Sequence, residues 1–260
     1  MFRSLATAAS GMEAQQTKLD VTANNIANVS TNGFKKGRAE FADLIYQNMR
    51  AAGAPTGPGT MAPSATEIGL GTRLVSTSRD QSQGQLNQTG NTLDVAIEGK
   101  GFFQVTMPDG SLAYTRNGAL QLSSEGKLVT SDGYAVGDIT VPTDAQSITI
   151  AANGQVSVTE PNQAQSVTLG QLQLATFANP GGLAANGSTL FTETSASGTA
   201  VLSNPSEGGA GSLQQGMLET SNVNVVDEMV DLIAGQRAYE VNSRVVKAAD
   251  DMLSDVAQLH

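Results

Sequence analysis

Apolar residues recur at every seventh position at both ends of this chain, and this spacing limits the possible folds more than any other feature. A seven-residue repeat sustained over several turns is typical of helices that pack in coiled coils. We therefore predict one helix at each end. The N-terminal stripe is Leu5, Met12, Leu19 and Ile26, and the C-terminal stripes are Val225, Leu232, Tyr239, Val246 and Leu253, then Gly235, Asn242, Ala249 and Val256, then Ala238, Val245, Met252 and Leu259.

The charges of the two ends favour their association. Residues 1–50 carry six basic and four acidic side chains, whereas residues 217–260 carry three basic and eight acidic ones. Helical segments of opposite net charge attract each other and orient each other. We therefore predict that residues 1–35 and 217–260 pair as a coiled-coil-like layer that forms one polymerisation domain.

Two paired helices would still leave apolar side chains in water, because three adjacent stripes cover more surface than one partner can bury. Each large apolar side chain left exposed forgoes about 1.5–3 kcal/mol. We expect other copies of the chain to complete the burial, and the helices of a free monomer to be largely disordered, because lone helices are marginal. The predicted contacts between subunits are Leu5, Met12, Leu19, Asn24, Asn25, Ile26, Asn28, Val225, Leu232, Tyr239, Asn242, Val245, Val246, Ala249, Met252, Leu253 and Val256.

Three asparagines, Asn24, Asn25 and Asn28, lie close together near the end of the first predicted helix. Asparagine is a weak helix former that usually prefers caps and turns. Amides buried between helices could hydrogen-bond across them and set their register. Alternatively, all three could belong to a frayed last turn, ahead of a stop at Gly33. We favour the inter-helix interpretation for Asn24 and Asn25, which lie a turn or more upstream.

The middle of the chain has the pattern of an antiparallel sheet. Phe103, Val105 and Met107 alternate with other residues before "PDG", and Ile148 and Ile150 alternate before "AANG". Short alternating runs that end in Gly, Asn and Asp indicate hairpins. We predict an α+β fold in which residues 84–216 form a central antiparallel all-β domain.

An extended connector is predicted between the first helix and the sheet, over residues 36–83. It contains a segment rich in Gly and Pro, residues 51–71. Such a composition, taken alone, is typical of a flexible linker.

Composition argues against several functional classes. The chain has no cysteine, and its one histidine is the last residue, His260; a Ser-His-Asp arrangement or a thiolate metal site is therefore not available. A net charge of −10 repels nucleic acids, and no stretch approaches the roughly 18 apolar residues of a membrane span. We predict no catalytic, cofactor-binding or metal-binding residues. A secreted β-rich glycan-binding module remains the alternative from another class.

The motifs themselves resemble a known family. "ANNIANVSTNGFKK" near the start, "GQLNQTGNTLDVAIEGKGFFQV" in the middle and "ETSNVNVVDEMVDLIAGQRAYEVNSRVVKAADDML" near the end are similar to the rod and hook proteins of the bacterial flagellum. The similarity covers nearly the whole chain. The length of the chain, the segment "QRAYEVNS" and the insertion at 51–71 make it look like a subunit of the distal part of the rod, with the hook protein and a β-domain-containing proximal rod protein as alternatives.

This resemblance implies a helical tube with terminal helices in its inner layer and β domains outside. It implies that subunits are exported by the flagellar type III apparatus without a cleaved signal peptide. Assembly would take place in the periplasm, between proximal rod and hook, inside the bushing formed by the peptidoglycan and outer-membrane rings. The expected work is to transmit motor torque. In this family the insertion at 51–71 distinguishes the stiff rod from the flexible hook, which favours a strut over a linker.

Overall fold

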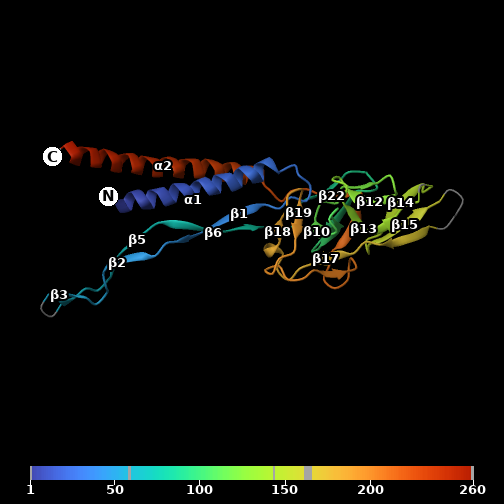
Figure 1. The fold of residues 1–260 in the computed structure, drawn as a ribbon, viewed down its shortest axis with the longest axis horizontal. Coiled ribbons are helices and arrows are strands. Elements are labelled where there is room, and N and C mark those ends of the chain that lie inside the picture. The colour runs from blue at the N-terminus through green and yellow to red at the C-terminus, as the bar shows by residue number, and fades with distance from the viewer. Residues whose placement is uncertain (1, 58–59, 143, 161–165, 259–260) are drawn as a thin grey trace. The chain divides into compact units, whose positions relative to one another are not determined.

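The structure is a computed structural model that describes residues 2–57, 60–142, 144–160 and 166–258. Two long helices, α1 (Phe2–Ala27) and α2 (Val225–Gln258), stand at the two ends of a chain otherwise built from short strands (Figure 1). The chain divides into two compact units. The helical unit comprises residues 1–26, 37–78 and 225–260, and the β unit comprises residues 27–36 and 79–224. Two helices with antiparallel sheets make the fold α+β, as the sequence predicts.

Acidic residues favour the start of α2, and a turn with a glycine ends α1. α2 begins directly after Asn224 and carries Asp227 and Glu228 in its first turn, where acidic groups favour the helix dipole. α1 gives way to a turn in which Thr31 donates its N–H to the carbonyl of Asn28 at 3.1 Å. Gly33 then adopts a φ of +70°, which glycine tolerates best. Within the described residues, neither helix has a stretch long and apolar enough to cross a membrane.

The helical unit also contains one long hairpin, which follows α1 and precedes α2 in the sequence (Figure 1). Its nested strand pairs place part of the Gly- and Pro-rich segment in strands, unlike the flexible linker that composition alone indicates. The N–H of Gly53 donates to the carbonyl of Ala62, and the N–H of Ala62 donates to the carbonyl of Ala54, each at 2.9 Å. The pairs are β1 (Gly37–Asp43) with β6 (Thr72–Arg79), β2 (Tyr46–Arg50) with β5 (Thr66–Gly69), and β3 (Pro55–Gly57) with β4 (Thr60–Met61).

The β unit is organised around a nine-stranded antiparallel sheet in which β9 (Phe102–Thr106) is central. The order is β11-β12-β13-β9-β10-β19-β18, with β17 pairing both β9 and β20. Its other strands are β10 (Leu112–Thr115), β11 (Leu120–Leu122), β12 (Lys127–Thr130), β13 (Ala135–Thr140), β17 (Leu174–Thr176), β18 (Ala184–Ala185), β19 (Leu190–Thr192) and β20 (Val201–Ser203).

Three smaller sheets complete the β unit. β14 (Ser147–Ile150), β15 (Gln155–Thr159) and β16 (Val167–Gln171) form one of them. The last strands of the unit pair with its first ones, so residues far apart in sequence close the fold. These pairs are β21 (Ser212–Gln215) with β8 (Val95–Glu98), and β22 (Met217–Glu219) with β7 (Leu86–Gln88).

The alternation predicted from the sequence places large side chains in the core of the β unit. Phe103 and Val105 of β9 are fully buried with Ile97, Leu128 and Leu174. On the other side of β9, Phe102 packs in a second cluster with aromatic rings in edge-to-face contact. The β unit therefore has its own hydrophobic core.

Candidate assembly surfaces

The helical unit has no comparable core. The buried apolar side chains in its described part are four alanines, Ala8, Ala14, Ala62 and Ala249. Burial stabilises in proportion to the apolar area removed from water, and alanine contributes little area. The helical unit taken alone therefore gains little from burial, in contrast to the β unit.

The two helices lie side by side and antiparallel (Figure 1). Lys18 pairs with Asp231 at 3.1 Å, and Asn25 donates to Glu228 at 3.0 Å. Their backbones approach closely at a glycine, because a Cβ placed on Gly235 would lie 3.0 Å from Cδ2 of Leu19. Whether the pair supercoils as a coiled coil stays a prediction.

Most of the predicted contact residues are partly or fully buried within the single chain. Tyr239, Val245 and Met252 are exposed, and the side chain of Val256 lies outside the described residues. Contacts of all these residues with other copies stay a prediction. The half-buried ones are Leu5, Met12, Leu19, Ile26, Val225, Leu232, Asn242, Val246 and Leu253, and Ala249 is fully buried.

The asparagines differ from one another in their surroundings. Asn25 is buried, and its amide donates to Glu228 and to the Gly37 carbonyl while accepting from the Gly37 N–H at 2.8 Å. It thereby joins α1 to α2 and to β1 within one chain. Asn28 accepts from the hydroxyl of Thr31 at 3.2 Å, as expected for a turn, whereas Asn24 is exposed. Bonds from these amides to another copy stay a prediction.

α2 has a second apolar side that the seven-residue pattern does not reveal. Val226, Val230 and Ile233 are 68%, 62% and 51% exposed, and their spacing of four and three residues places them on one side of the helix. This side is opposite the one that faces α1. The exposed stripe, defined here as Val226, Met229, Val230, Ile233 and Val241, is therefore available to a partner. In the sequence, the spacing of four and three residues between these apolar positions indicates the exposed stripe.

The hairpin also exposes large apolar side chains. Ile45 is 82% and Met61 is 74% exposed. Exposed apolar side chains, where they form contiguous patches, mark interaction sites in soluble proteins. The other exposed apolar side chains of the hairpin are Phe41, Tyr46, Met49, Ile68, Leu70, Leu74 and Val75.

A buried cluster of charges lies in the β unit. The Glu219 carboxylate, which is fully buried, accepts from Lys35 Nζ at 2.7 Å, from Arg116 Nε at 2.8 Å and from the Gly84 N–H at 2.9 Å. Burial lowers the pKa of Lys35, against the opposing attraction of Glu219. Sequence reasoning missed this cluster, because its three charged residues are far apart along the chain and have no shared pattern.

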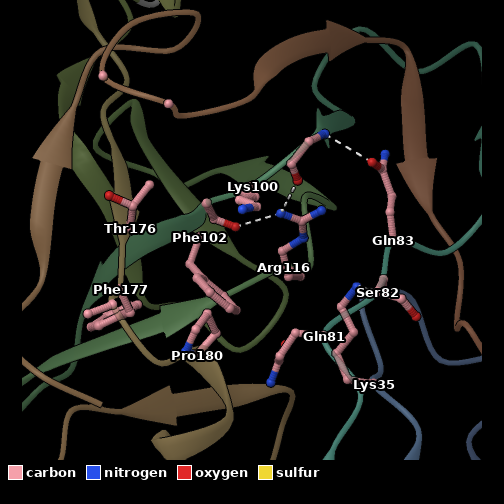
Figure 2. Close-up of a pocket in the computed structure, with 15 residues that line it drawn as sticks. Lys35, Gln81, Ser82, Gln83, Lys100, Phe102, Arg116, Thr176, Phe177 and Pro180 are labelled. Carbon is pink, nitrogen blue, oxygen red and sulfur yellow. Dashed lines mark hydrogen bonds between the residues drawn. The ribbon is translucent and has the colours of Figure 1, made fainter.

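Lys35 and Arg116 of this cluster line a pocket of about 420 Å³ in the β unit (Figure 2). Phe102, Phe177 and Pro180 contribute apolar surface to it, and Lys100 also lines it. Arg116 donates to the carbonyls of Gly99 and Gly101 as well as to Glu219, so it links the connection between β8 and β9 to the buried carboxylate. Within the described residues, no group of three or more His, Cys, Asp or Glu is placed to hold a metal ion.

Three family models match this chain. The model described as flagella basal body rod protein matches residues 5–35, and the one described as flagellar hook protein FlgE/F/G D1 domain matches residues 96–158. The third, described as flagellar basal body rod FlgEFG protein C-terminal, matches residues 214–259. Both helices and the first part of the β unit are therefore covered.

Relatives align with the chain over its full length. The flagellar basal-body rod protein FlgG of Agrobacterium fabrum is 48% identical over 259 residues, 99% of each chain. That of Bacillus subtilis is 42% identical over 265 residues, 100% of this chain and 99% of the relative. The flagellar hook-basal body complex protein FlhP of Bacillus subtilis is 30% identical over 267 residues, 97% of each chain.

Proposed function

This chain belongs to the bacterial flagellar basal-body rod protein family and is a structural subunit of the distal rod, and we propose that it works as a self-assembling helical tube that carries motor torque. The observation that supports self-assembly is that the buried apolar side chains in the described part of the helical unit are all alanines. Its apolar surface gains the full free energy of burial only against other copies.

The exposed stripe is the surface that we assign to these contacts. The side of α2 that faces α1 is already occupied, through Lys18, Asn25 and Leu19. The side chains of the stripe on the opposite side are exposed in the described part of the chain, and each one that another copy buries is worth about 1.5–3 kcal/mol. We propose that helices of neighbouring copies pack on this stripe, with the α1–α2 pair as the repeating element of a coiled-coil-like inner layer.

The three-part division predicted from the sequence stays a proposal, and its bounds differ from those of the two compact units, since residues 27–36 and 217–224 belong to the β unit. We propose residues 1–35 and 217–260 as the polymerisation domain and residues 84–216 as an outer domain that folds on its own core. The connector, residues 36–83, would be a strut that braces neighbouring subunits. The three successive strand pairs of the hairpin support a strut over a linker, and its exposed apolar side chains give it surface to bind with.

The family assembles in the flagellar basal body with other rod and hook proteins. For this chain we propose the proximal rod proteins and the hook protein as its axial neighbours. We further propose the peptidoglycan and outer-membrane ring proteins as its bushing, the periplasm as its compartment, and the flagellar type III apparatus as its export route. We assign it no enzymatic activity, cofactor or nucleic-acid partner.

The proposal predicts that the purified full-length chain forms tubes as its concentration rises. Electron microscopy of the wild-type chain should show them, with helix content by circular dichroism rising at the same concentration. A variant lacking residues 225–260 should form no tubes and keep the circular dichroism of the folded β unit. A wild-type chain that stays monomeric with constant helix content at all concentrations would instead favour a glycan-binding module.

A further inference from the structure

The chain enters or leaves the β unit four times, after Ile26, Lys36, Ser78 and Asn224. Force that travels along the backbone between the two units must pass through these points. Three short segments of the β unit receive that force, namely residues 27–36, 79–85 and 219–224. How they are joined to one another therefore matters for a molecule that carries torque.

Asn222 joins all three segments with one side chain. Its Oδ1 accepts from the Lys36 N–H at 2.8 Å, and its Nδ2 donates to the carbonyl of Asp80 at 2.9 Å and to the carbonyl and hydroxyl of Ser82 at 3.2 and 3.0 Å. The backbone adds a direct link, because Asp80 donates its N–H to the Lys36 carbonyl at 2.9 Å. The segments are thus cross-linked where they meet.

Glu219 joins the same segments to each other and to the sheets. Its carboxylate binds Lys35 of the first segment and Gly84 of the second, and its backbone carbonyl accepts from the Gly33 N–H at 2.8 Å. Arg116, its other partner, donates to the carbonyls of Gly99 and Gly101 at 2.9 and 2.6 Å, between β8 and β9. Charge-assisted bonds in a buried network are strong and mutually reinforcing.

A third tie reinforces the same place. The guanidinium of Arg79, at the end of β6, lies 5.9 Å from the ring centre of Phe34 and 5.8 Å from that of Phe191. Contacts of this kind between a cation and an aromatic face stabilise further. The second segment is therefore attached both to the first segment and to β19 of the large sheet.

We propose that Glu219 and Asn222 are positioning residues that transmit mechanical load from the crossing segments to the sheets of the β unit. This inference rests on the proposed function, since it needs an assembled tube. The Glu219 carboxylate and the Asn222 amide stiffen the tube, and this role is separable from their contribution to folding stability.

Asn222→Ala tests the proposal without leaving a buried charge unpaired. In the unassembled full-length chain, the Lys36 amide should exchange roughly tenfold faster with deuterium, because it loses its acceptor. In assembled tubes, the bending persistence length measured from electron micrographs should fall below that of the wild type. The control is Ile150→Val on β14, which costs core stability at a strand that supplies none of the tying residues.

The outcomes separate the two claims. Load transmission is supported if Asn222→Ala tubes bend more easily than wild-type tubes while Ile150→Val tubes keep wild-type stiffness. The two variants should then have similar melting temperatures. Equal stiffness of all three tubes overturns it and leaves the proposed function intact. Failure of Asn222→Ala alone to assemble also overturns it, because Asn222 would then be an assembly contact. A wild-type chain that forms no tubes overturns the proposed function itself.

Discussion

Replacing Val230 and Ile233 together by aspartate is expected to raise the concentration needed for assembly by roughly 10²–10⁴-fold. Both side chains belong to the exposed stripe of α2, and burying each between copies is worth about 1.5–3 kcal/mol. Each 1.4 kcal/mol lost corresponds to about tenfold in an association constant. Burying the new carboxylates unpaired would add to the loss. Sedimentation of polymer from a concentration series measures the threshold directly.

Val201→Asp is the matched control for this charge. Val201 is exposed on β20 of the β unit, outside the surface assigned to contacts between α2 helices, so the added charge should leave those contacts unchanged. Aspartate, valine and isoleucine have similar intrinsic helix propensities, so a difference between the variants reports on contacts between copies. Unchanged assembly of the Val230→Asp/Ile233→Asp double variant would show that the exposed stripe is not an interface.

Glu219→Ala is expected to destabilise the β unit by about 3–5 kcal/mol, because it leaves Lys35 and Arg116 buried without their counter-ion. That is a large part of the roughly 5–15 kcal/mol by which domains are stable. Urea denaturation of the full-length chain, followed by near-ultraviolet circular dichroism at a concentration below assembly, measures the loss.

The control is Glu125→Ala, which also removes a carboxylate from an ion pair with a lysine. Glu125 and Lys127 are 3.2 Å apart but exposed, with side-chain accessibilities of 72% and 51%. Surface pairs are worth about 0–1 kcal/mol, since water already solvates both charges. Similar denaturation midpoints for Glu219→Ala and Glu125→Ala would contradict the assigned role of the buried cluster.

The helices and many hairpins were predictable because their signals are local. A seven-residue repeat defines α1 and α2, and "PDG" and "AANG" mark real turns, after β9 and β14. In each case the relevant residues lie within a few positions of one another, so periodicity and turn chemistry are sufficient.

The remaining features depend on residues that are distant in sequence. Glu219 is separated by 184 residues from Lys35 and by 103 from Arg116, and no local pattern connects them. The partners of Asn25 in β1 and α2 were hidden for the same reason. The hairpin at 37–79 depends on pairing between strands whose Gly and Pro content alone indicates a loop. The exposed stripe escaped notice because the seven-residue repeat was treated as the whole apolar surface of α2.

Hydrogen exchange of the α2 amides in the wild-type chain, compared between dilute and assembled protein, tests the central claim most directly. We predict rapid exchange from Val226 to Leu253 in the dilute chain, where burial is incomplete, and strong protection in the tube, while amides of β9 stay protected in both. Strong protection of α2 in the dilute chain would contradict this account, because the helical unit would then be stable without other copies.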